Sequence, residues 1–495
     1  MMIGPAFAAD EAGGAVQPQI KKIVDEVSAD RIRATIQKLV SFGTRNTMSS
    51  QDDPQRGIGA ARKWIFSEFQ SYSPRLQVRY DHWRVKKTGR IFKDADLYNV
   101  IAVLPGKKSP ETQIFVSGHY DSLNLGNRPA GGAPAGPGTD AAAAAPGAGN
   151  GPPTLSLEQQ EKNAELPAPG ACDDGSGTAA VMELARVMSQ YEFDKTLVFV
   201  SFAGEEQGLI GSTLLAAKAH KENQVIEAVL NNDIIGTDVA GNGRTGNATV
   251  SVYSDESMDS PSQQLSRYVR EIGERYMPSM KVDTVFMQDR LGRGGDHSPF
   301  QMEGYAAVRI STPNEIYVNQ HHATDLLENM SVPYTAKVAK INAAAAASLA
   351  MAPKSPVILR QPGAGGFGGA RGGTANAAGE AGGGGGNAAG RAGTGAGRRP
   401  TPMISRGSGY DAVLQWRAAG SDEGIKGYTV VMRSTTAPYW EREIYAGKTT
   451  QLTLKDVSID DAKFGVKAIG LDGSESLVTP YTYPPRQKTE IETVQ

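Results

Sequence analysis

The stretch that most constrains the fold is an apolar run followed at once by a polar turn and a helical pattern. Residues 196–201 read Thr-Leu-Val-Phe-Val-Ser, residues 204–208 read Gly-Glu-Glu-Gln-Gly, and a helical pattern begins at Leu209. Such a run predicts a strand buried on both faces, as in parallel sheets covered by helices. Glu205 and Glu206 would then lie at the carboxyl end of a strand, where α/β sheets bind their ligands.

The two adjacent carboxylates repel each other, so each tends to raise the pKa of its neighbour. A nearby cation, or a different role for each glutamate, would resolve this repulsion. The alternative is a solvated pair at a helix N-terminus, which the helix dipole favours. The choice depends on whether other polar residues gather at the same edge of the sheet.

A second predicted strand, residues 113–121, ends in His119 and Asp121. Positions two apart share a face of a strand, so the two side chains can act together. Imidazole is the commonest side-chain ligand of metals, and a carboxylate beside it fixes its orientation. The alternative is a structural histidine at a strand end with a capping aspartate.

Three more candidates follow predicted strands or precede predicted helices. Asp173 opens an Asp-Asp pair before a helix, and Asp233 interrupts the apolar run 227–235. A charge in a buried strand needs a partner, which a metal ion or an arginine would supply. His321, in a tandem with His322, precedes the predicted helix from Val332 to Met351.

Two imidazoles and several carboxylates form a ligand set that suits zinc in a hydrolytic site. The carboxylates outnumber those that one zinc ion needs, which suggests two ions that share a bridging carboxylate. The set contains His119, Asp173, Glu205, Glu206, Asp233 and His321.

These motifs resemble the di-zinc aminopeptidase family, which includes secreted bacterial leucyl aminopeptidases, glutamate carboxypeptidase and the glutaminyl cyclases. The resemblance rests on four motifs in the family's order: His119-Tyr120-Asp121, Asp173-Asp174-Gly175-Ser176-Gly177, Gly204-Glu205-Glu206-Gln207-Gly208, and His321 before Asp325. It implies an α/β fold with a mixed, mostly parallel twisted sheet flanked by helices.

The resemblance also implies roles for the candidates in a metal-dependent aminopeptidase. A water molecule shared by two Zn²⁺ ions would hydrolyse the N-terminal peptide bond. The implied roles are His119 and Asp233 as ligands of one zinc, Glu206 and His321 as ligands of the other, Asp173 as the bridge, Glu205 as the general base and Asp121 as the residue that orients His119. The loop at Asp296 and His297 resembles a segment that shapes the site wall, so His297 is not counted as a ligand.

Other functions within and outside this fold stay open. A carboxypeptidase shares these motifs, a glutaminyl cyclase would use one zinc, and a catalytically inactive receptor-like module would have lost ligands. The tandem also leaves the last ligand open between His321 and His322, and the spacing to Asp325 favours His321.

Composition excludes several other classes of function. The net charge of −2 gives no electrostatic reason to expect nucleic acid or an anionic membrane as a partner. The single cysteine, Cys172, allows no internal disulfide, and no apolar run is long enough to cross a bilayer. Residues 1–20 are interpreted as the remnant of an export signal or as a disordered leader, and the former predicts a secreted or periplasmic protein.

Composition also divides the chain. We expect a di-zinc peptidase domain over 21–353, with a low-complexity insertion at 122–168 that is either a lid or a tolerated surface loop. A Gly/Ala-rich linker at 354–402 precedes a small all-β sandwich at 403–495 that resembles a fibronectin type III domain. Peptides or proteins are the expected substrates, and the sandwich is expected to bind a surface, a polysaccharide or a protein. Since it carries no candidate ligand, its removal is expected to leave turnover intact.

Overall fold

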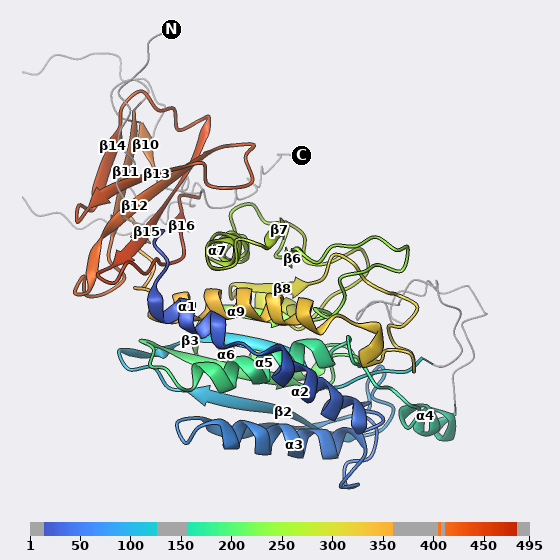
Figure 1. Ribbon diagram of the computed structural model, residues 1–495. Coiled ribbons are helices and arrows are strands. Elements are labelled where there is room, and N and C mark those ends of the chain that lie inside the picture. Colours follow the sequence, from blue (N-terminus) through green and yellow to red (C-terminus); the bar gives the residue numbers. More distant parts are fainter. Residues whose placement is uncertain (1–13, 126–155, 360–403, 407–410, 483–495) are drawn as a thin grey trace, which may run out of the picture.

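The computed structural model describes residues 14–125, 156–359, 404–406 and 411–482. Its centre is an eight-stranded mixed sheet with the order β1-β2-β4-β3-β5-β8-β6-β7 (Figure 1). The strands are β1 (Gln77–Val85), β2 (Ala95–Leu104), β3 (Ser109–His119), β4 (Lys195–Phe202), β5 (Val225–Asn232), β6 (Thr249–Tyr253), β7 (Lys281–Val285) and β8 (Ala307–Ser311).

Four neighbouring strands at the middle of this sheet, β4, β3, β5 and β8, run parallel to one another. Their carboxyl ends therefore lie at one edge of the sheet. On the outer side β2 pairs antiparallel with β4 and β1 pairs antiparallel with β2, and β6 pairs antiparallel with β8. The predicted mixed, mostly parallel sheet flanked by helices is confirmed.

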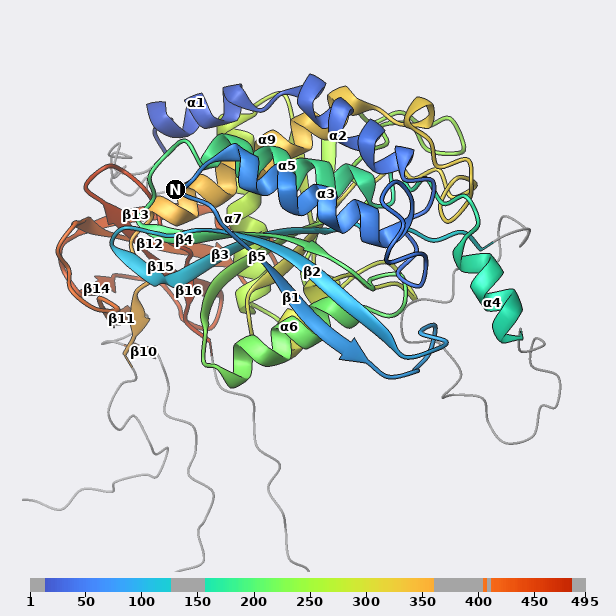
Figure 2. The same ribbon diagram turned by 90° about the horizontal axis from the view of Figure 1, so that it is seen from below.

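Helices cover both faces of the sheet, with α1, α2, α3, α5 and α9 on one side and α6 on the other (Figure 2). The helices are α1 (Pro18–Glu26), α2 (Ala29–Ser41), α3 (Gly57–Tyr72), α4 (Leu157–Ala164), α5 (Gly175–Met188), α6 (Ile210–Lys221), α7 (Pro261–Tyr276), α8 (His297–Met302) and α9 (Val332–Met351), with a 3₁₀ turn at Leu327–Asn329. No helix in these described ranges is long and apolar enough to cross a membrane.

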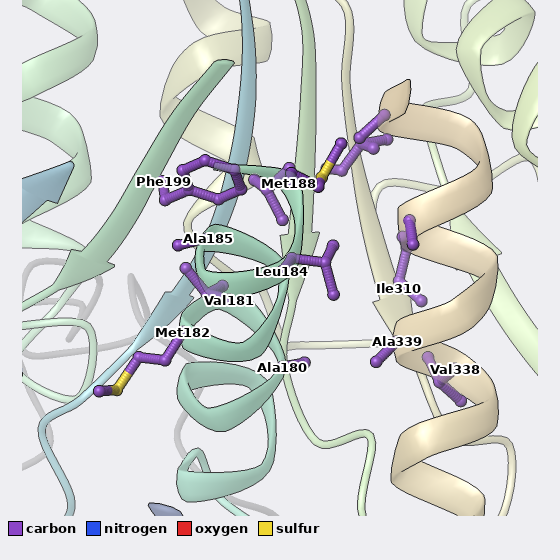
Figure 3. Packing of buried hydrophobic residues seen from close by; sticks show 14 of the residues in the cluster. Ala180, Val181, Met182, Leu184, Ala185, Met188, Phe199, Ile310, Val338 and Ala339 are labelled. Atoms are coloured by element: carbon purple, nitrogen blue, oxygen red, sulfur yellow. The ribbon is translucent and has the colours of Figure 1, made fainter. Parts of the chain in front are cut away.

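The larger core forms where α5 and α9 pack side by side on one face of the sheet. Val181, Leu184 and Met188 recur at helical spacing on α5 and are buried, close to Phe199 of β4 (Figure 3). On the opposite face Phe300 of α8 joins a second core with residues of α6. Burial of both faces explains why the middle strands are apolar throughout.

Beyond α9 the chain forms two four-stranded sheets that share one core, in which Trp416, Val430 and Phe464 are buried. Their strands are β9 (Val357–Ile358), β10 (Ser405–Arg406), β11 (Ala412–Arg417), β12 (Ile425–Ser434), β13 (Arg442–Gly447), β14 (Gln451–Leu454), β15 (Ala462–Gly470) and β16 (Thr479–Pro480). Their pairings are antiparallel. The fibronectin type III likeness of this unit stays a prediction.

Three elements differ from the sequence-based expectation. Helix α1 begins inside the predicted leader and buries Ile20 completely, whereas residues 1–13, where the export-signal pattern lies, are outside the described residues. Helix α4 forms within the predicted insertion, whose residues 126–155 are likewise not described. Strand β9 lies in the predicted linker but pairs with β11, so the second unit takes a strand from before the Gly/Ala-rich segment.

Candidate active site

Three parallel strands deliver the polar candidates to one edge of the sheet. His119 is the last residue of β3, Glu205 and Glu206 follow β4, and Asp233 follows β5. Strand β3 lies between β4 and β5, so these side chains converge. Asp233 is the first residue after its strand, and not a residue within the strand as the apolar run suggested.

The His119 ring is buried and held by its Nδ1 side. Nδ1 lies 3.2 Å from the backbone oxygen of Asp121 and 3.5 Å from its Oδ1. Nε2 therefore points the other way, 3.3 Å from Oδ1 of Asp173 and 3.8 Å from Oδ1 of Asp233. An imidazole anchored through one nitrogen presents the other to a ligand.

Among the residues that the structure describes, two groups of side chains could hold a metal ion, and Asp173 belongs to both. The first contains His119, Asp173 and Asp233, and the second contains Asp173, Glu206 and His321; within each, the potential ligand atoms lie within 4.8 Å of one another. His321 Nε2 is 3.1 Å from Oδ2 of Asp173 and 3.1 Å from Oε2 of Glu206. The two oxygens of Asp173 thus face different histidines, which is the geometry of a bridging carboxylate.

Glu205 belongs to neither group, although it is buried and its Oε2 lies 3.9 Å from His119 Nε2. Burial raises its pKa well above the ordinary value, and the nearby carboxylates of Asp233 and Glu206 add to the effect. The Asp121 carboxylate accepts hydrogen bonds from the backbone N–H groups of Glu205 (3.3 Å) and Glu206 (3.2 Å). Asp121 therefore fixes the turn that carries both glutamates as well as the His119 ring.

Two buried charged residues, Asp325 and Arg45, hold the loop that presents Asp173. Asp325 accepts hydrogen bonds from the backbone N–H groups of Cys172 (2.9 Å) and Asp173 (3.0 Å), and burial raises its pKa to about 7. The guanidinium of Arg45 donates to the backbone oxygens of Tyr120, Leu39, Pro169 and Gly170. Burial alone would raise the pKa of Asp173, but its close contacts with the imidazoles of His119 and His321 outweigh it and hold that pKa well below the ordinary value.

Asp174 is not in either group but joins three elements. Its carboxylate accepts from the backbone N–H groups of His119 (3.1 Å), Gly177 (2.8 Å) and Ile234 (3.3 Å). The ends of β3 and β5 and the start of α5 are thus fixed to one side chain. Removal of this carboxylate would leave three N–H donors without their partner in a buried environment, which is costly.

The other histidines and the cysteine lie outside both groups. His322 is partly exposed, and its backbone bonds with Asn319 and Asp325 shape the loop. His297 is buried, with Nε2 2.7 Å from the Gln288 oxygen, and burial lowers its pKa to about 4. Cys172 is buried beside the site without belonging to either group.

The donor set fits zinc. Among the described residues, Nε2 of His119 and Oε1 of Glu206 are buried without a hydrogen-bond partner. Both atoms belong to residues of the potential metal groups, where a bound ion would give them the partner that the protein does not supply. Nitrogen from imidazole and oxygen from carboxylates are donors that zinc prefers.

Comparison with known proteins identifies the family. The model of "Peptidase family M28" matches residues 99–346, a span that contains every candidate ligand. The chain belongs to this family. This M28 peptidase is 35% identical to a probable zinc metalloprotease of Pyricularia oryzae, over 93% of the chain and 84% of that relative. It is 31% identical to a probable zinc metalloprotease of Leptosphaeria maculans, over 95% of the chain and 97% of the relative.

Among solved structures, the LapA aminopeptidase of Legionella pneumophila is similar at 18% identity with a TM-score of 0.48, over 70% of this chain and 78% of that one. An aminopeptidase of Aneurinibacillus sp. strain AM-1 is similar at 16% identity with a TM-score of 0.46, over 67% and 96%. The family membership makes this chain a zinc metallopeptidase, and its particular specificity is a separate question.

Two residues beside the site were missed in the sequence. Arg309 of β8 lies 2.9 Å from Asp233 through Nη2, so the charge after β5 has both of the partners considered for it, an arginine and a potential metal group. A lone arginine in the apolar run 306–310 was the available signal. Gln320 donates from Nε2 to Oδ2 of Asp173 at 2.9 Å, and nothing in its local sequence distinguishes it from a loop glutamine.

Proposed function

We propose that this M28 peptidase is an aminopeptidase that uses two zinc ions, with His119 and Asp233 on one, Glu206 and His321 on the other, and Asp173 between them. The observation that carries the proposal is that Asp173 belongs to both potential metal groups. Zinc, when bound, polarises the scissile carbonyl and lowers the pKa of a water molecule beside it.

The chain's own residues would move the proton. Glu205 stands apart from both metal groups, so its carboxylate is free to accept a proton from the attacking water and to give it to the leaving amine. Its burial and raised pKa suit that exchange, because a general base works best when its pKa lies near the working pH. Asp121 would hold Glu205 and Glu206 in register through their backbone N–H groups.

The charge of the site supports a substrate with a free α-amine. Seven buried carboxylates lie at or beside it: Asp121, Asp173, Asp174, Glu205, Glu206, Asp233 and Asp296. A free amine can pair with carboxylates of this kind, whereas a terminal carboxylate would need a cationic partner. The guanidinium groups nearby already bind protein groups: Arg309 pairs with Asp233 and Asp289, and Arg290 and Arg293 pair with Glu315.

The test is a panel of substrates that differ in whether the amino or the carboxyl terminus is free. Aminoacyl anilides, the same anilides with an acetylated amine, and N-blocked dipeptides with a free carboxylate are assayed with purified full-length protein. We expect hydrolysis of the free-amine substrates only, its loss with a chelator and its return with Zn²⁺. Cleavage of the N-blocked dipeptides would instead indicate a carboxypeptidase, and cyclisation of N-terminal glutamine without hydrolysis a cyclase.

Localisation and the second unit are proposals of the same kind. The N-terminal Ala-Phe-Ala pattern supports a secreted or periplasmic protein. The sandwich at 403–495, likened to fibronectin type III domains, is proposed to bind a surface, a polysaccharide or a protein. Fractionation of the native cells with an antibody against the chain would test the first proposal. Binding of the full-length protein to candidate surfaces, polysaccharides and proteins would test the second.

A further inference from the structure

One carboxylate oxygen of Asp233 lies close to both an imidazole and a guanidinium. Its Oδ1 lies 3.8 Å from Nε2 of His119 and 2.9 Å from Nη2 of Arg309. The side chains of Asp233 and Arg309 are only 3% and 2% exposed, so water screens their interaction little. The oxygen nearest His119 in the first metal group is therefore also the one that an arginine already binds.

Arg309 is held in this position from its other side. Nη1 donates to Oδ2 of Asp289 at 2.5 Å and to the backbone oxygen of Gly294 at 2.6 Å. Gly295 packs closely on the pair, since a Cβ there would stand 3.2 Å from Oδ2 of Asp233 and 3.3 Å from Nη1 of Arg309. Arginine keeps its charge in proteins, so a fixed positive charge stands beside the first metal group.

The carboxylates of the second metal group have different partners, and the guanidinium of Arg90 donates to the backbone oxygen of Glu206 at 2.7 Å. Within the described part of the chain, the recorded ion pairs of Glu206 and Asp173 involve only histidines, which are neutral when they bind a metal. With Asp173 shared, the first group has Asp233 paired with the permanent charge of Arg309, whereas Glu206 of the second group is paired with His321. A divalent cation is attracted more strongly to the second group.

We propose that Arg309 weakens metal binding at the group of His119, Asp173 and Asp233, so that zinc fills the group of Asp173, Glu206 and His321 first. Arg309 acts here as a positioning residue: it orients Asp233 and competes with the metal for its charge. This inference rests on the proposed use of two zinc ions.

The test is calorimetric titration of chelator-treated full-length protein with Zn²⁺. We expect two classes of site that differ in affinity by about tenfold or more, the size of effect that one charge has at a partly screened distance. Glu206→Gln should remove the tighter class, and Asp233→Asn should remove the weaker class. The reverse assignment, or two equal sites, would overturn the inference.

A charge-matched variant separates competition from simple support. Because Arg309→Met alone would take from the buried Asp289 one of its two arginine partners and leave it Arg290, Arg309→Met is combined with Asp289→Asn. The double variant should bind the weaker zinc about tenfold more tightly, whereas Asp289→Asn alone and Arg309→Lys should not tighten it. Loss of the weaker zinc from a folded double variant would show that Arg309 only supports Asp233, and equal tightening by Asp289→Asn alone would show that its charge is not the cause.

The outcomes also separate this inference from the proposed function. If the wild-type protein binds a single zinc ion at saturation, the two-zinc proposal itself fails. If it binds two ions, and the double variant leaves their separation unchanged, only the role of Arg309 fails. Circular dichroism of each variant establishes that the comparison is between folded proteins.

Discussion

The C-terminal unit is fixed to the peptidase unit by buried ion pairs, and Arg433→Met tests how much they contribute. Nη2 of Arg433, in β12, donates to both carboxylate oxygens of Asp259, just before α7, at 2.8 and 2.9 Å. Their side chains are 4% and 3% exposed. Nη1 of Arg433 also donates to the backbone oxygen of Ala437 at 2.6 Å.

Breaking a buried pair by removing one partner costs about 3–5 kcal/mol of unfolding free energy, because a charge is left uncompensated. Asp259 would keep one partner, since Nη1 of Arg267 lies 3.2 Å from its Oδ1. The expected loss for Arg433→Met is therefore at the lower end, about 3 kcal/mol. Methionine keeps most of the aliphatic stem, so the change is mainly one of charge and hydrogen bonding.

Denaturant unfolding followed by circular dichroism and by tryptophan fluorescence measures this loss. The matched control is Lys455→Met, because Lys455 lies 3.7 Å from Asp411 with its side chain 79% exposed; a loss below about 0.5 kcal/mol is expected there. A double-mutant cycle with Asp259→Asn isolates the coupling energy. A loss below about 1 kcal/mol for Arg433→Met would refute the reasoning, since that is the value of an exposed pair.

Three further predictions follow from the same structure. Glu205→Gln should lower kcat by several orders of magnitude while zinc content stays near that of the wild type, whereas Glu206→Gln should lose zinc. If metal analysis and kinetics show the same behaviour for both variants, the assignment of Glu205 as the base and Glu206 as a ligand is wrong. His321→Ala should lose one zinc ion and nearly all turnover, and His322→Ala should keep both, as checked by metal content and rate. Removal of residues 401–495 should lower stability and yield an aggregation-prone protein in thermal unfolding and size-exclusion chromatography, because it uncovers charged and aromatic groups of α7; an unchanged melting temperature would contradict this.

The truncation prediction adds a loss of stability to the expectation drawn from the sequence, which concerned turnover alone. A Gly/Ala-rich segment predicts a flexible linker, and such a linker suggested that the sandwich makes few contacts with the peptidase unit. The structure shows instead that Lys467 of β15 is 2% exposed and pairs with Glu271 of α7 at 3.2 Å and with Glu475 at 2.5 Å. Arg275 of α7 pairs with Glu475 at 2.7 Å as well. Contacts between residues about 200 positions apart leave no local pattern, so composition could not reveal them.

The sheet and the gathering of the site were predictable because both follow from local signals. Apolar runs bounded by turns predicted β3, β4 and α9 closely, and the polar residues after parallel strands had to meet at one edge. The roles of individual polar residues were less accessible. Arg309 and Gln320 act through partners 76 and 147 positions away, Asp233 and Asp173, and only the folded register brings them together.

The difference between carboxylates held by backbone N–H groups and carboxylates of the potential metal groups explains how so many carboxylates can be buried at one edge of a sheet. Asp121, Asp174 and Asp325 each accept two or more backbone N–H groups, so their charges are stabilised by the loops that they fix. Asp173 and Glu206 lack that degree of internal support, and Oε1 of Glu206 has no partner among the described residues. Asp233 is intermediate because Arg309 supplies part of its compensation. The chain thus stabilises by itself the carboxylates that shape the site, and it leaves least compensated those that a metal ion would bind.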